Sequence, residues 1–293
     1  MKWEQSYGHR TFTQVYIRPG CTGIGDHAFD PSFARNLEIW DELNPTYCWE
    51  FEPSLKYVYI PSSVTEIGEG AFQNCTCSED IFSRGLDVEI DDADYDEPGL
   101  DKIGANAFRD SSLCSIDMPN TVTEIGDGAF RNCKRLTESA LSGSLRIIGR
   151  EAFAYCPIPK IELYGDDTEI ADGAFQGCRE LKEAELYGVK RIGVKAFYGC
   201  GLKKIGIFPD TVTEIGESAF QDCNQTEEII LYNGLKTIGP YAFDGDYRSI
   251  EVDVPSTVTE IGERAFGGIE EIYYSGDAKD DGNDWGARFL NSW

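Results

Sequence analysis

The ten cysteines are the residues whose type and spacing first suggest chemistry. Six of them occupy one sequence position, three residues after a phenylalanine: Cys75, Cys133, Cys156, Cys178, Cys200 and Cys223. Such a row suggests a disulfide framework or a metal site, but structural metal ligands come in close pairs rather than a whole repeat apart. Free cysteine also packs as a small apolar side chain. We therefore expect buried structural thiols in a reducing compartment, with no metal and no cofactor.

Two further features leave their chemistry open. Four cysteines lie outside this row, and the sequence does not define their redox state: Cys21, Cys48, Cys77 and Cys114. The acidic segment 91–97 begins like a calcium-binding loop, with Asp92, Asp94 and Asp96 in alternation. Glu97 occupies the position where such a loop requires glycine. We expect a solvated loop there, and calcium binding stays an open question.

No catalytic constellation is evident in the sequence. His9 and His27 are the only two histidines, and neither accompanies a serine or cysteine in a nucleophile elbow. The glycines belong mainly to repeated turns rather than to a phosphate-binding loop. Paired carboxylates of a hydrolase are the least favoured alternative, because nothing singles out one pair. We predict a protein that is not an enzyme.

These residues belong to a sequence repeat that must form their scaffold. The phrase Ile-Gly-x-x-Ala-Phe, or a close variant, recurs with its phenylalanine at Phe29, Phe72, Phe108, Phe130, Phe153, Phe175, Phe197, Phe220, Phe243 and Phe266. From Phe108 onward, successive copies are 22 or 23 residues apart. A fixed period of this size is typical of a solenoid, in which each coil contacts only its neighbours.

Residues 113–133 illustrate what one repeat predicts. Ile116 and Met118 have the period-2 spacing of a strand with one face inward, and Pro119 then ends the strand. Gly126 is expected to permit a tight turn. Ala129 and Phe130 should point inward from a short helical turn. Stacked coils place like residues on like residues.

The complete pattern, L-x-x-I-x-I-P-x-x-V-x-x-I-G-x-x-A-F-x-x-C, resembles the BspA-like class of leucine-rich repeats over about residues 12–275. The resemblance implies an α/β solenoid, a right-handed curved superhelix with a parallel β-sheet on its concave face. Short strands and helical turns would form the other faces, in about 11 coils. Members of the class are mostly surface or secreted microbial proteins linked to adhesion and protein–protein contact rather than catalysis.

We expect a single solenoid over residues 1–293. Its predicted parts are an N-terminal lead-in at 1–11, repeats at 12–268 with a degenerate coil near 30–54 and an acidic insert near 87–99, and a C-terminal strand and cap at 269–293.

The charge is strongly negative, with 52 Asp and Glu against 26 Lys and Arg and a net charge of −26. Such a surface repels nucleic acid and anionic membrane, so neither is an expected partner. A basic protein partner is favoured, with a simple role in solubility as the alternative. No apolar run is long enough for membrane insertion. The oligomeric state is left open.

The first residues contain no apolar segment of a signal peptide, which favours an intracellular protein. A cell-surface or secreted location is the alternative if the sequence is a piece of a longer chain.

The concave face is the predicted protein-binding site, because solenoids present an extended surface there. Residues between the inward apolar positions should face outward, and tyrosine beside acids is typical of binding surfaces. A solvated strand face with tyrosines packed between coils is the alternative. The predicted site consists of Tyr57, Tyr59, Ser115, Asp117, Glu138, Lys160, Glu162, Tyr164, Glu183, Glu185, Tyr187, Lys204, Glu228, Ile230, Tyr232, Glu251 and Asp253.

Two functions follow from this surface. The favoured one is a non-enzymatic scaffold that binds a protein partner, as a subunit of a larger assembly. The alternative is a cell-surface adhesin that binds host protein or glycan.

Overall fold

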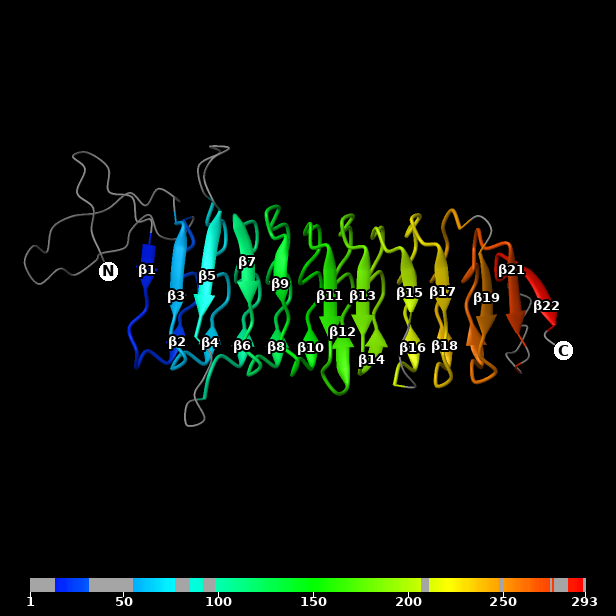
Figure 1. The fold of residues 1–293 in the computed structure, drawn as a ribbon, viewed down its shortest axis with the longest axis horizontal. Helices are drawn as coiled ribbons and strands as arrows, with labels where there is room; N and C mark the ends of the chain where they lie inside the picture. The colour runs from blue at the N-terminus through cyan, green and yellow to red at the C-terminus, as the bar shows by residue number, and fades with distance from the viewer. Residues whose placement is uncertain are drawn as a thin grey trace, which may run out of the picture.

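Two rows of parallel strands run along the molecule, the first row above the second in Figure 1. The computed structural model describes residues 14–31, 55–76, 85–91, 98–206, 211–247, 250–274, 276 and 284–291. The first row consists of β1 (Gln14–Tyr16), β3 (Tyr57–Ile60), β5 (Leu86–Ile90), β7 (Leu113–Asp117), β9 (Glu138–Ala140), β11 (Lys160–Leu163), β13 (Glu183–Leu186), β15 (Lys204–Gly206), β17 (Glu228–Ile230), β19 (Glu251–Val254), β21 (Glu271–Tyr274) and β22 (Arg288–Asn291).

The second row is one continuous parallel sheet. Its strands are β2 (Gly23–Ile24), β4 (Glu66–Ile67), β6 (Lys102–Ile103), β8 (Glu124–Ile125), β10 (Ile147–Ile148), β12 (Thr168–Ile170), β14 (Val189–Ile192), β16 (Glu214–Ile215), β18 (Thr237–Ile238) and β20 (Glu260–Ile261). The first row is hydrogen-bonded in four sheets, β1-β3-β5-β7-β9, β11-β13, β15-β17 and β19-β21-β22. The predicted solenoid of stacked parallel strands is therefore confirmed. Its handedness, curvature and number of coils stay predictions.

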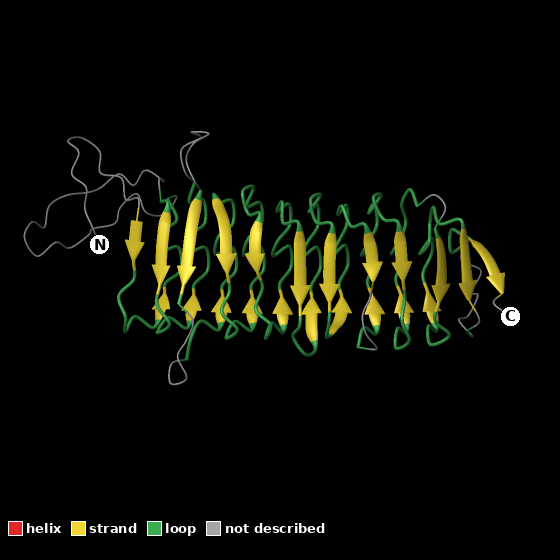
Figure 2. Ribbon diagram, in the orientation of Figure 1, coloured by secondary structure: helices red, strands yellow, loops and turns green. Residues whose placement is uncertain are grey.

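The expected helical turns around the repeat phenylalanine are hydrogen-bonded turns instead, and the described residues contain no helix (Figure 2). Within one coil, the N–H of Ala129 donates to Gly126 O at 3.2 Å and that of Cys133 donates to Phe130 O at 3.1 Å. The N–H of Phe130, however, donates to Ala152 O of the next coil at 2.7 Å. Alternate N–H groups thus bond between coils, which leaves them unavailable for the i→i−4 bonds of a helix.

A column of phenylalanine rings forms the centre of the core. The rings of neighbouring coils stack from Phe29 to Phe266, with centroid separations from 4.9 Å to 5.7 Å. Phe175, for example, lies 5.3 Å from Phe153 and 5.2 Å from Phe197, nearly parallel to both. The predicted stacking of like residues is confirmed. This column fixes the register of every coil relative to its neighbours.

The repeat cysteines are buried free thiols, as predicted. The Sγ of Cys133 donates to Phe108 O at 3.0 Å, and that of Cys178 donates to Phe153 O at 3.1 Å. Each thiol thus bonds the carbonyl of the phenylalanine one coil back. Tyr247 takes over this role near the C-terminal end, where its hydroxyl donates to Phe220 O at 2.8 Å.

The cysteines outside the repeat position differ in exposure. Cys21 is an exposed free thiol and Cys114 is a half-buried one. Burial raises the pKa of Cys114. Cys48, Cys77 and most of the acidic loop 91–97 lie outside the described residues.

Gly126 is required by the approach of the neighbouring coil rather than by an unusual turn conformation. A Cβ at this position would lie 2.6 Å from the backbone nitrogen of Ala105, closer than real contacts allow. The left-handed backbone of the turn falls on other residues, including Gly128 and Asn132. The Ile-Gly pair of the repeat therefore combines a core side chain with a close backbone contact.

The predicted degenerate coil near residues 30–54 does not separate the coils on either side of it. β1 pairs directly with β3 in the register Val15↔Val58, and Phe29 stacks on Phe72 at 4.9 Å. A coil between them would have disrupted both contacts, so that expectation is corrected. Residues 32–54 themselves lie outside the described residues.

The first row continues at the C-terminal end through β21 and β22, which pair in parallel. The N–H of Phe266 donates to Trp285 O at 2.9 Å, and the Trp285 ring lies edge-on to Tyr274 at 6.1 Å. The Trp285 backbone therefore pairs with the last phenylalanine of the column, and its partly buried side chain packs against the core cluster. The C-terminal cap stays a prediction.

Candidate binding surface

The predicted site residues lie on the first-row strands or directly after them. Their side chains alternate with buried apolar ones, as in β11, where Ile161 and Leu163 are buried while Lys160 and Glu162 face outward. We call this surface the first-row face. The alternation places the residues on one surface; whether that surface is concave or binds a partner stays a prediction.

The strand register brings charged residues of neighbouring coils together. Lys160 is opposite Glu183, and Glu162 is opposite Glu185. The Nζ of Lys160 lies 2.7 Å from Glu162 and 3.6 Å from Glu183. The hydrogen bond with Glu162 raises the pKa of Lys160, and the same bond lowers the pKa of Glu162. Exposed ion pairs add little stability, so these charges chiefly define the chemistry of the surface.

Tyr164 and Tyr187 form an exposed aromatic pair directly after β11 and β13. Their rings stack in parallel with centroids 5.2 Å apart, and the side chains are 55% and 40% exposed. The Tyr164 hydroxyl donates to Glu162 Oε2 at 2.9 Å. The hydrogen bonds with Glu162 and Glu185 raise the pKa of Tyr164 and Tyr187, respectively. The two rings are thus held in place while their outer surface is open to solvent.

A hollow of about 270 Å³ lies beside this pair, between β9 and β11. It is lined by Ser139, Ala140, Leu141, Lys160, Glu162 and Tyr164. In the repeat, Ala140 and Ser142 occupy the positions of Glu162 and Tyr164. The shorter side chains leave the space that an acid and a tyrosine fill in the next coils.

A second tyrosine cluster includes a residue that the sequence analysis did not assign to the site. Tyr16 on β1 lies 5.5 Å from Tyr57 and 6.3 Å from Tyr59, measured between ring centroids. The hydroxyls of Tyr57 and Tyr59 donate to Glu89 and Asp91, respectively. The bond to Glu89 raises the pKa of Tyr57 to about 12. The alternation Gln14-Val15-Tyr16 is the sequence signal that places Tyr16 on the same face.

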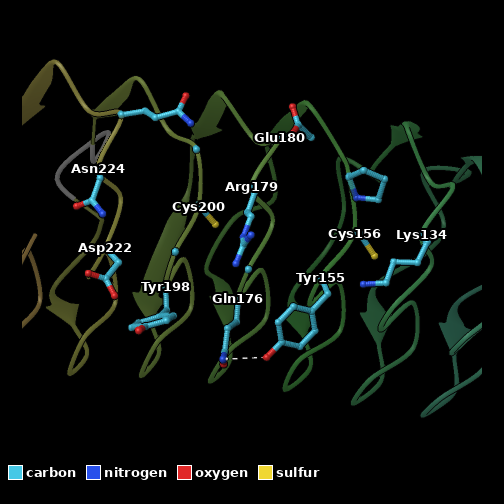
Figure 3. A pocket seen from close by; sticks show the side chains of 15 residues that line it. Lys134, Tyr155, Cys156, Gln176, Arg179, Glu180, Tyr198, Cys200, Asp222 and Asn224 are labelled. Carbon is cyan, nitrogen blue, oxygen red and sulfur yellow. Dashed lines mark hydrogen bonds between the residues drawn. The ribbon is translucent and has the colours of Figure 1, made fainter. Parts of the chain in front are cut away.

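The sequence analysis also missed a larger hollow on another part of the surface. This groove, of about 940 Å³, lies on the connections that lead from the repeat phenylalanine to the next first-row strand (Figure 3). It is lined by Lys134, Tyr155, Cys156, Pro157, Gln176, Gly177, Arg179, Glu180, Tyr198, Gly199, Cys200, Gly201, Asp222, Asn224 and Gln225. None of these residues belongs to the first-row face.

Unequal connection lengths explain the groove. One residue, Pro157 or Gly201, separates the repeat cysteine from the next apolar residue in two of these coils. Two residues occupy the same interval in the coils around them: Lys134-Arg135, Arg179-Glu180 and Asn224-Gln225. Residues of the shorter and the longer connections line this groove together. This difference of one residue was visible in the sequence.

Tyr155 is the most exposed aromatic side chain in the groove. Its side chain is 39% exposed and its φ is 64°. Tyr155 lies two residues after the repeat phenylalanine, where the other described repeats have asparagine, aspartate, glycine or proline. The amide nitrogen of Gln176 donates to its hydroxyl at 3.2 Å, as Figure 3 shows. Lys134 and Arg131 lie 5.7 Å and 5.8 Å from the ring centroid, within cation–π range.

No metal centre is evident in the part of the chain that the structure describes. Within it, no group of three or more His, Cys, Asp or Glu side chains could hold a metal ion. The same residues include no helix with the length and apolar character to cross a bilayer.

The stacked strands, the apolar L-x-x-L-x-L spacing and the phenylalanine column define a leucine-rich-repeat solenoid. The chain belongs to the BspA-type leucine-rich repeat family, whose repeat model matches residues 4–90, 101–208 and 190–276. No curated protein matches the chain.

Solved structures that are similar to the chain include the following three. A leucine-rich repeat protein from Bacteroides ovatus is 20% identical with a TM-score of 0.50, over 100% of this chain and 97% of that one. The pneumococcal vaccine antigen PcpA is 18% identical with a TM-score of 0.43, over 90% and 72%. A leucine-rich cell surface protein from Faecalibacterium prausnitzii is 22% identical with a TM-score of 0.35, over 92% and 89%. The first of these supports the fold.

Proposed function

We propose that the protein is a non-enzymatic scaffold that binds a protein partner through the first-row face. The observation that carries this proposal is the stacked pair Tyr164–Tyr187, which is exposed and flanked by fixed charges. Exposed tyrosines contribute disproportionately to protein interfaces, because they offer a large contact area with few rotatable bonds.

The pair is already ordered before a partner arrives. The parallel stack and the Tyr164–Glu162 hydrogen bond restrict both rings. Binding then costs less conformational entropy than ordering two mobile side chains would. The hollow beside Tyr164 offers a place for one partner side chain.

The surrounding charges favour a basic partner. Glu183 is exposed and Glu185 is half-buried, in a chain whose net charge is −26. Acidic groups around aromatic anchors would steer a basic surface toward the face and set its orientation. Lys160 and Lys204 provide local positive positions within this surface, which would restrict the choice of partner.

Affinity capture from the native cell with mild crosslinking tests this proposal. The wild-type chain should recover a protein partner at a fixed ratio. The double variant Glu183→Lys and Glu185→Lys should recover at least about tenfold less, because the charge that steers the partner is reversed. The matched control is Glu217→Lys with Glu263→Lys, which makes the same charge change at exposed turn positions.

Equal recovery with the face variant and the control would reject the first-row face as the binding site. The same experiment shows where the protein is located. Recovery on the outer cell surface, with host protein or glycan and no intracellular partner, would instead support the adhesin alternative.

A further inference from the structure

The groove around Tyr155 is a second candidate site, independent of the first-row face. It spans successive coils and carries both an exposed aromatic ring and a polar rim. The short connections at Pro157 and Gly201 are two coils apart, as are Tyr155 and Tyr198. At the usual strand spacing, two coils correspond to about 10 Å.

The polar rim is rich in hydrogen-bond donors. The side-chain oxygen of Asn224 already accepts the N–H of Asp246 at 2.8 Å, and that of Gln225 accepts Lys182 Nζ at 3.0 Å. Each amide therefore has its NH₂ group left to donate. Lys134 and Arg179 add side chains that can only donate. Of the two carboxylates that line the groove, Asp222 already accepts from Tyr198, and Glu180 contributes acceptors. A ligand that fits this rim should present mainly acceptors.

The two tyrosines line the groove with their rings. The Tyr198 hydroxyl is engaged by Asp222, and this hydrogen bond raises the pKa of Tyr198. The Tyr155 hydroxyl accepts from Gln176 at 3.2 Å and keeps its own O–H to donate, which adds to the donors of the rim. Gly199 forms part of the floor, and a Cβ there would meet no atom within 4 Å. Gly199 therefore leaves open space in the groove next to Tyr198.

We propose that this groove binds a proline-rich peptide in the polyproline II conformation. Such a peptide turns once every three residues, about 9 Å, which matches the two-coil spacing of the short connections and of the tyrosines. An extended β-strand repeats its side chains at about 6.8 Å and fits less well. Proline has no N–H, so a proline-rich backbone presents carbonyl acceptors to the donor-rich rim. Proline rings pack against aromatic side chains in known recognition of this kind.

Fluorescence anisotropy with labelled decaproline tests the assignment on the full chain. Decaproline should bind with a Kd below about 1 mM, and a Gly-Ser peptide of equal length should not bind. Tyr155→Asn removes the ring and introduces the residue found at the same position in Asn74 and Asn132. It should weaken binding about tenfold while Tm stays the same or rises, because asparagine tolerates this backbone conformation.

A second variant keeps the test independent of Tyr155. Gly199→Asn places a side chain in the open floor at a φ of 65° that asparagine accepts, and it should also weaken binding. The control Tyr164→Ser, on the first-row face, should leave decaproline binding unchanged and reduce only capture of the protein partner. A failure of the groove proposal can therefore be distinguished from a failure of the proposal for the first-row face.

Three results would overturn the assignment. The first is equal binding of decaproline by the wild type and both groove variants. The second is no binding of decaproline by the wild type in this concentration range. Binding of cellohexaose without decaproline would reassign the groove to a saccharide.

Discussion

At the residue scale, the buried cysteines of the repeat stabilise the fold through hydrogen bonds as well as packing. Cys178 is fully buried, and its Sγ donates to Phe153 O at 3.1 Å. Cys178→Ala removes this bond and leaves a small cavity, so we expect a loss of about 1–2 kcal/mol in the free energy of unfolding. Urea denaturation measures this, with the exposed Cys21→Ala as a neutral control. Unchanged stability would show that the bond adds nothing.

The same buried cysteines predict that the free energy of unfolding depends on pH in the alkaline range. Burial raises the pKa of Cys223 from 9.0 to about 12. The thiol is protonated in both folded and unfolded chains below pH 9, so its contribution is complete there. Between pH 9 and 12 the unfolded thiol loses its proton first, and stability falls by up to about 1.4 kcal/mol per pH unit.

The variant Cys223→Ala isolates this contribution. It should be less stable than wild type at pH 8, but its unfolding free energy should decline less steeply between pH 9 and 10.5. Chemical denaturation at several pH values provides the comparison. Equal slopes for the two proteins would exclude a role for this thiol in the alkaline transition.

At the element scale, the phenylalanine column couples neighbouring coils. Phe175 is fully buried between Phe153 and Phe197. Phe175→Ala should cost about 3–5 kcal/mol, because it creates a large cavity in a close-packed core. The surface control Tyr164→Ser should cost less than about 1 kcal/mol. A cost below about 1 kcal/mol for Phe175→Ala would contradict the role of the column.

Much of this element-scale organisation could be predicted from the sequence. The spacing of Phe130 and Cys133 within one repeat predicts their burial, and the period of 2 around Ile116 predicts the outward face. The prediction of a helical turn at Phe130 was wrong, because the N–H of Phe130 donates to Ala152 O in the next coil. A single repeat contains no information about that partner.

Other features required comparison between coils. The degenerate coil near residues 30–54 was inferred from a length close to two periods and from the strand-like sequence at Leu37–Trp40, whereas the pairing of β1 with β3 is visible only in the structure. The groove depends on Pro157 and Gly201, each of which is unremarkable within its own repeat. Only alignment with Arg179-Glu180 in the coil between them reveals the shorter connections.

At the scale of the whole molecule, the net charge of −26 predicts self-repulsion that salt should relieve. Raising NaCl from about 10 mM to about 150 mM shortens the Debye length from about 30 Å to about 8 Å. We therefore expect Tm to rise over this range, as measured by differential scanning calorimetry. A constant or falling Tm would mean that attractive ion pairs such as Lys102–Glu124 outweigh the repulsion.

The central claim is that the first-row face contacts a protein partner. Site-specific photo-crosslinking in the native cell tests it most directly, with the photoreactive residue at position 187 or at position 147. Tyr187 is 40% exposed on the first-row face, and Ile147 is 46% exposed on the second row. The account predicts a discrete partner crosslink from position 187 and none from position 147. A crosslink from position 147 alone, or equal crosslinks from both, would contradict it.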